Sequence, residues 1–190
     1  MQATLTRTLK THFHVVARRP KLHFLSSVLS LREKGLPVPD WMLYILWEDE
    51  FDNLVVNAGL DDSLDKHLRG AAYTAAWYVG LADGTPTFAA ADTQAGHAGW
   101  VEVVAYDEAV RQTLTLGAVA AQSVDNVGNE AVFTISANDT VIGGAFISTT
   151  DTRGGSVDTL YGGGVFTAGD KTLDDDDTLT VTVTCTAAAA

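Results

Sequence analysis

The strand-like segment near the C-terminus, "TLTVTVTCTA" at residues 178–187, alternates threonine with apolar residues. One side of it holds Leu179, Val181, Val183 and Cys185, a period of two that predicts a strand with one buried face. Eight such short β-prone runs, separated by turn-forming clusters, fill the C-terminal two thirds of the chain at a spacing of about ten residues. No helical period lies between them, which argues against parallel βαβ units. The pattern predicts a mainly β fold, an antiparallel β-sandwich or jelly-roll-like body.

Two of these runs contain consecutive glycines, in "IGGAF" and "YGGGVF". A phosphate-binding P-loop requires GxxxxGK[ST] leading into a helix, and neither run has that pattern. Aromatic and β-branched residues flank the glycines, so we interpret them as bulges or as places where strands cross closely.

Charge is distributed unevenly over the 190 residues, whose formal net charge is −12. Residues 1–39 hold seven Lys and Arg and one acidic residue, a net of +6, whereas residues 40–190 hold five basic and 23 acidic residues, a net of −18. We therefore predict two parts: a basic N-terminal arm, residues 1–52, and a β-sandwich body with a short leading helix, residues 53–190. The arm is expected to seek an acidic surface on a partner or on the body of a neighbouring copy.

The arm is expected to be extended and partly helical. In "KLHFLSSVLSLREKG" the apolar residues recur at spacings of three and four, which predicts a short amphipathic helix that ends at Gly35. A second short helix is predicted from Trp41, with Asp40 as its N-cap.

Three aromatic residues of that second helix, Trp41, Tyr44 and Trp47, would lie roughly on one side. They either anchor the segment against the body or dock a partner protein, and both alternatives remain open at this stage. The predicted partner-binding residues of the arm are Arg7, Lys10, Arg18, Arg19, Lys21, Trp41, Tyr44 and Trp47.

A third helix of two turns is predicted in "DDSLDKHL", where Asp65 and Arg69 have the i, i+4 spacing of a surface ion pair.

Candidate catalytic groups are few. His97, in "DTQAGHAGW", could act as a base with Asp92 nearby, but no nucleophile motif such as GxSxG is present. We expect His97 to be a loop residue that bonds the backbone, and we predict no catalytic residue. The single cysteine, Cys185, is expected to be a structural strand residue because no basic residue lies near it in sequence.

Candidate metal ligands are equally sparse. His12 and His14 in "HFH" would share one strand face, yet no third ligand has a matching spacing. Four consecutive aspartates, residues 174–177, could offer oxygen ligands to Ca²⁺ or could form a solvated turn; they do not match an EF-hand loop. We predict no metal ion and no cofactor.

Neither a membrane nor a nucleic acid is expected as a partner. The most apolar run, "WMLYILW", has seven residues, whereas a spanning helix needs about 20. Residues 40–190, with a net charge of −18, would repel phosphate.

Several sequence blocks resemble those of tailed-bacteriophage virion proteins, which carry "WYVGL", "HAGW", "GAF", "LY" and "DTL" in the same order. The similarity covers about residues 53–186, and none of the blocks carries catalysis. The resemblance implies a non-enzymatic structural protein of the virion, made in the host bacterial cytoplasm.

Within the virion, the preferred role is a capsid decoration (cement) protein on the head surface. It would bind the major capsid protein shell through its N-terminal arm, contact neighbouring copies of itself as a homo-oligomer, and stabilise the head. The alternative is a tail or tail-fibre component that binds a host receptor or glycan through body aromatics such as Trp77, Tyr106 and Tyr161.

Overall fold

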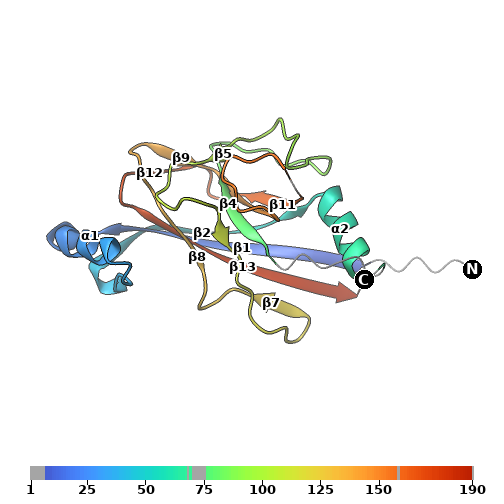
Figure 1. Ribbon diagram of the computed structural model, residues 1–190, viewed down its shortest axis with the longest axis horizontal. Helices are drawn as coiled ribbons and strands as arrows, with labels where there is room; N and C mark the ends of the chain where they lie inside the picture. Colours follow the sequence, from blue (N-terminus) through green and yellow to red (C-terminus); the bar gives the residue numbers. More distant parts are fainter. Residues whose placement is uncertain (1–6, 68, 70–75, 158, 190) are drawn as a thin grey trace, which may run out of the picture.

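The computed structural model describes residues 7–67, 69, 76–157 and 159–189 (Figure 1). Strands dominate this part of the chain. In chain order the elements are β1 (Arg7–Pro20), η1 (Leu22–Phe24), α1 (Leu25–Glu33), η2 (Asp40–Met42), β2 (Leu43–Asp52), β3 (Leu54–Val55), α2 (Asn57–His67), β4 (Tyr78–Ala82), β5 (Glu102–Val103), β6 (Gln112–Thr113), β7 (Ser123–Asp125), β8 (Ala131–Thr134), β9 (Thr140–Ile142), β10 (Gly144–Ser148), β11 (Leu160–Val165), β12 (Lys171–Leu173) and β13 (Thr178–Ala189).

The first sheet has β1 at its centre. Its order is β2-β1-β13, and β7 and β8 both pair with the far edge of β13, all antiparallel. In the β1–β13 register Phe13 lies opposite Val183 and Val15 opposite Val181, and all four side chains are fully buried. The alternation predicted for β13 is therefore confirmed, because its apolar positions form the inner face of this sheet.

A second antiparallel sheet packs against that inner face. Its order is β3-β11-β10-β4-β5, with β6 also paired to β4, and β9 and β12 form a separate two-stranded ribbon. Val79, Leu81 and Ile147 of the second sheet share one hydrophobic core with Phe13 and Val181 of the first. The predicted mainly β, antiparallel fold is thus confirmed, whereas the jelly-roll connectivity remains a prediction.

The predicted division at residue 52 differs from this arrangement. Residues 7–20 do not form an arm but the central strand of the first sheet, and residues 43–52 form the strand beside it. The physical reason is alternation: Lys10 and Arg18 lie on the outer face of β1, while Phe13, Val15 and Ala17 enter the core. Basic character in the N-terminal segment therefore does not keep it out of the body.

One predicted helix of this segment is present and the other is not. The 3-10 turn η1 and helix α1 occupy residues 22–33, as expected. Trp41 lies in η2, a 3-10 helix of only one turn, and a strand begins at Leu43 where the helix was predicted to continue. A short apolar run rich in aromatics fits either period, and pairing with β1 selects the strand.

The glycine runs allow aromatic rings to lie directly on the outer face of the second sheet. Phe146 pairs with Gly80 on one side and Gly163 on the other. A Cβ on Gly80 would overlap the Phe146 ring, and one on Gly163 would overlap the ring of Phe88. Gly80 lies outside the two predicted runs, but within them a Cβ on Gly144 would also overlap the Gly164 carbonyl. The interpretation of the runs as sites of close approach is therefore confirmed at Gly144 and Gly163.

A second buried cluster follows from this arrangement. Trp100 and Phe146 pack together there with Val56, Ala82 and Leu160, and Phe88 joins them from the long connection between β4 and β5. That connection, residues 83–101, therefore covers the outer face of the sheet. The β-prone run that contains β4 begins at residue 72 in the sequence, and its first four residues, 72–75, lie outside the described residues.

Candidate interaction surface

Residues 21–42, called the projection here, leave the body between β1 and β2. Pro20 pairs with Leu43 at its base, and the Lys21 N–H donates to the Met42 carbonyl at 2.9 Å. Figure 1 shows α1 at one end of the molecule, apart from the two sheets. The connection between two neighbouring strands is thus a small folded unit rather than a tight turn.

The projection has its own packing. Val28 is fully buried, and the rings of Phe24 and Trp41 meet edge to face with centroids 4.9 Å apart. Helix α1 ends as predicted: Gly35 has φ +62°, its N–H donates to the Arg32 carbonyl at 2.8 Å, and Leu36 N–H reaches the Leu31 carbonyl at 2.9 Å. This pair of bonds is a Schellman cap, which needs the left-handed backbone that glycine adopts readily.

The four-aspartate turn fastens the base of the projection to the body. Arg19 donates from Nε and Nη2 to the Asp177 carboxylate at 2.6 and 2.5 Å, and from Nη2 to Asp174 at 2.6 Å. Arg32 of α1 donates to the Asp176 side chain at 3.1 Å and to its backbone carbonyl at 2.9 Å. The hydrogen bond to Asp177, whose side chain is fully buried, raises the pKa of Arg19 above its usual range.

This turn is therefore not simply solvated: it binds two arginines of the N-terminal segment. Among the described residues no group of three or more His, Cys, Asp or Glu side chains is arranged to hold a metal ion. We call the set Arg19, Arg32, Asp174, Asp176 and Asp177 the arginine clamp.

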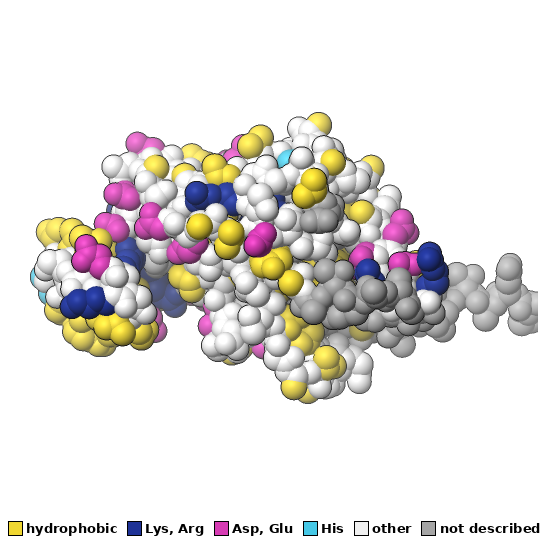
Figure 2. All heavy atoms as spheres, viewed as in Figure 1, with side chains coloured by type: hydrophobic (Ala, Val, Ile, Leu, Met, Phe, Trp, Pro, Cys, Tyr) yellow, Lys and Arg dark blue, Asp and Glu magenta, His cyan; other side chains and the backbone are white. Residues whose placement is uncertain are grey.

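The clamped projection exposes apolar side chains to solvent. Leu22 is 85% exposed, Trp41 58% and Leu36 50%. Figure 2 shows hydrophobic atoms on both sides of the protruding lobe. Single exposed leucines are ordinary, but several exposed apolar side chains on one small unit make the projection a candidate contact surface.

The predicted aromatic residues divide between the two alternatives. Trp41 and Tyr44 are exposed, as docking residues would be. Trp47 instead anchors the strand: it is partly buried, its ring centroid lies 5.2 Å from that of Phe166, and its Nε1 is buried without a hydrogen-bond partner in the described structure.

The predicted basic residues are mostly engaged within the chain. Arg19 belongs to the clamp, Arg18 donates to Thr180 Oγ1 at 3.1 Å, and Lys21 Nζ donates to the Trp41 carbonyl at 2.6 Å. Lys10 is exposed on the outer face of β1. Arg7 begins β1, but its side chain lies outside the described part. The acidic surface expected on another molecule is thus supplied, for Arg19 and Arg32, by the chain's own C-terminal turn.

The histidines behave as ordinary structural residues. His12 Nδ1 lies 3.1 Å from Asp52 Oδ1 and His14 Nε2 lies 2.7 Å from Glu48 Oε1, both across the β1–β2 pair on one face.

His97 and Asp92 are held within their own loop. His97 Nδ1 lies 3.0 Å from the Trp100 carbonyl oxygen and its ring stacks on the indole, with centroids 3.7 Å apart. Asp92 Oδ2 accepts the indole N–H of Trp100 at 3.2 Å and the Ala89 N–H at 3.0 Å. The expectation that His97 bonds the backbone is confirmed.

The body aromatics nominated for glycan binding do not form an open platform. Tyr106 is 2% exposed, and Trp77 packs against Tyr161 with ring centroids 5.3 Å apart. Burial also raises the pKa of Tyr161 to about 12. Aromatic residues flanked by glycine or alanine look available in sequence, but here they fill the interior between the sheets.

Sequence reasoning missed one buried ion pair. Arg111 is fully buried and binds both carboxylate oxygens of Glu102, at 2.8 and 2.6 Å. Its remaining N–H groups reach Ser148 Oγ and the carbonyls of Thr150 and Gly155 at 3.1–3.4 Å. With every donor satisfied, the pair serves to tie residues 148–155 to β5. The one available signal was that Arg111 and Arg153 are the only arginines after residue 75.

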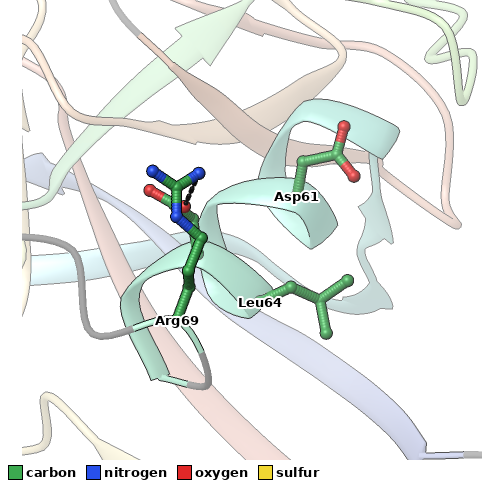
Figure 3. Close-up of a pocket in the computed structure, with 4 residues that line it drawn as sticks. Asp61, Leu64 and Arg69 are labelled. Atoms are coloured by element: carbon green, nitrogen blue, oxygen red, sulfur yellow. Dashed lines mark ion pairs between the residues drawn. The ribbon is translucent and has the colours of Figure 1, made fainter.

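A shallow depression beside α2 is lined by Asp61, Leu64, Asp65 and Arg69 (Figure 3). The predicted surface pair is present there, with Arg69 Nη1 2.9 Å from Asp65 Oδ1. The depression is open, and Arg69 is largely exposed, so its polar groups are already served by each other and by solvent.

In comparisons with known proteins, no family model and no curated protein matches the chain. Within the described residues, no helix has both the length and the apolar character needed to cross a membrane.

Proposed function

We propose that this chain is a non-enzymatic structural protein of a tailed-phage virion that decorates the capsid and stabilises the head. The sequence blocks in residues 53–186 resemble virion proteins and carry no catalytic motif. The observation that carries the proposal is the projection, a folded unit that is fastened to the body and exposes Leu22, Leu36 and Trp41.

The docking element in this proposal is the projection rather than a flexible arm. A segment that orders only on binding loses part of its interaction free energy to ordering, whereas a preorganised one does not. The Schellman cap at Gly35 and the arginine clamp fix the projection before any partner arrives. Its exposed aromatic and leucine side chains are of the type that forms the centre of protein interfaces. The proposed partner is the major capsid protein of the head shell.

The test is co-sedimentation of purified chain with undecorated shells of the same phage. Leu22→Glu and Trp41→Glu place a charge on the projection surface, and Val119→Glu, at a side chain 74% exposed in the body, is the matched control. The control is expected to sediment with the shells like the wild-type chain, and both projection variants are expected to stay in the supernatant. Equal sedimentation of all variants would remove the role given to the projection.

A further inference from the structure

Strand β2 is the terminal strand of the first sheet. Among the described residues it pairs only with β1, so one of its edges is free of strand partners. Part of that edge is covered, because Asp49 accepts hydrogen bonds from Thr167 Oγ1 and from Ala168 N–H, and Thr167 Oγ1 also lies 3.3 Å from the Glu50 carbonyl. No comparable cover is found over Leu43–Trp47 in the described structure.

The open and the covered halves of β2 differ in charge. Leu43–Trp47 holds no charged residue and exposes Tyr44 (42%) and Ile45 (56%). The following half holds Glu48, Asp49, Glu50 and Asp52. Proteins commonly guard free strand edges with charged side chains, and the open half of β2 has none. Its register with β1 does shift at Leu46, because Trp47 lies opposite Ala17 and Ile45 opposite Arg18.

We propose that a second copy of this chain pairs antiparallel with β2 along Leu43–Trp47, about a twofold axis at Ile45. Tyr44 then lies opposite Leu46 of the second copy, and Leu43 opposite its Trp47. A twofold axis makes the interface self-complementary, and main-chain hydrogen bonds join the two first sheets into one.

The charge pattern along the strand selects this partner and this direction. Antiparallel pairing centred on Ile45 matches apolar half to apolar half and sends the two acidic halves to opposite ends. Parallel pairing of two copies would instead set like carboxylates side by side, which is destabilising.

The same register places the acidic half of each copy beside the residues that precede β2 in the other copy. Glu48 falls opposite Met42 of the second copy, whose carbonyl accepts the backbone N–H of Lys21. Lys21 begins the projection, but its Nζ donates to the Trp41 carbonyl, and the same register sets Glu50 opposite Asp40 of the second copy. The proposal therefore rests on the apolar match of Leu43–Trp47 and not on an attraction between charges.

This inference goes beyond the proposed function because pairing of two copies needs no capsid. It is tested on the purified full chain by analytical ultracentrifugation at about 100 µM, where a pair with micromolar affinity is almost fully associated. The wild-type chain is expected at twice its chain mass. Ile45→Lys places two lysines at the axis and is expected to give the monomer. Val132→Lys, at a side chain 40% exposed on β8 of the same sheet, is expected to remain dimeric.

A cross-link gives a second, independent readout. In a Cys185→Ser background, Ile45→Cys is expected to form a disulfide-linked dimer on mild oxidation, whereas Val119→Cys is not. A monomeric wild-type chain, an unchanged mass for a folded Ile45→Lys variant, or equal cross-linking at the two cysteine positions would each overturn the proposal. If the purified chain is monomeric and Ile45→Lys loses binding to shells instead, a capsid strand occupies the edge and a second copy does not.

Discussion

Replacing Glu102 by Gln changes one functional group and is expected to lower the free energy of unfolding more than most single substitutions in this fold. The side chains of Arg111 and Glu102 are 0% and 7% exposed, so water cannot replace a lost partner. Glu102→Gln preserves the shape but removes the negative charge and directs an amide NH₂ toward a guanidinium N–H. Glu102 Oε2 also accepts the Gly154 N–H at 2.8 Å, and this bond is at risk in the same substitution.

The magnitude follows from the burial. Leaving one member of a buried ion pair without its partner costs about 3–5 kcal/mol. For a domain of this size, each kcal/mol shifts Tm by about 2–4 °C, so a fall of about 10 °C is expected. Urea unfolding followed by circular dichroism measures the free energy directly, provided that the m-value is unchanged.

Two further variants make the comparison specific. Asp65→Asn breaks the exposed pair with Arg69, whose side chain is 83% exposed, and should cost no more than about 0.5 kcal/mol. The double variant Glu102→Gln, Arg111→Met also removes the buried positive charge that Glu102→Gln leaves without a partner, and it should be more stable than Glu102→Gln alone. A loss for Glu102→Gln as small as that for Asp65→Asn would refute the reasoning.

Two other predictions concern the β2 edge and the glycine face. Burial opposes ionisation of Asp49, but its hydrogen bonds with Thr167 and Ala168 outweigh burial and lower its pKa. The stability advantage of the wild type over Asp49→Asn should therefore be fully present above about pH 5 and should shrink as the pH falls through the lowered pKa of Asp49. Urea unfolding midpoints of both proteins at pH 6 and pH 3 measure this advantage. A difference that does not change with pH would contradict the prediction. Gly80→Ala should lower the free energy of unfolding by about 1–3 kcal/mol, because the added methyl group would overlap the buried Phe146 ring. Gly96→Ala has room for the methyl group and should be nearly neutral, and thermal melts of both variants measure the difference.

Local pattern was sufficient where a segment's structure depends on its own residues. The alternation in β13 predicted both the strand and its buried face, and the apolar spacing before Gly35 predicted α1 and its end. Gly144 and Gly163 were assigned correctly to close approach because the residues that flank their glycine runs are aromatic and β-branched, whereas Gly80 was not singled out.

Pattern was insufficient where long-range pairing decides. Strand β1 pairs with β13, with Thr11 opposite Cys185, and nothing in residues 7–20 indicates a partner so far along the chain. Trp41, Tyr44 and Trp47 match a helical face in sequence, yet β1 recruits the last two into a strand.

The candidate surface was predicted only in part. Of the three aromatic residues predicted to anchor the segment or to dock a partner, Trp41 and Tyr44 are exposed and Trp47 packs against the core. Partner binding by Trp41 and Tyr44 stays a prediction. The basic residues were assigned to an outside partner because an excess of positive charge at one end suggests one. The fold instead brings the C-terminal aspartate turn to Arg19 and Arg32, a proximity that charge counting along the chain does not reveal.

The central claim, that the chain decorates the head of a virion, is tested most directly by locating it on intact particles. Purified virions labelled with gold-conjugated antibodies raised against the folded chain should carry gold over the whole head surface in electron micrographs. Gold confined to the tail would contradict the decoration role, and particles without gold would contradict the virion assignment.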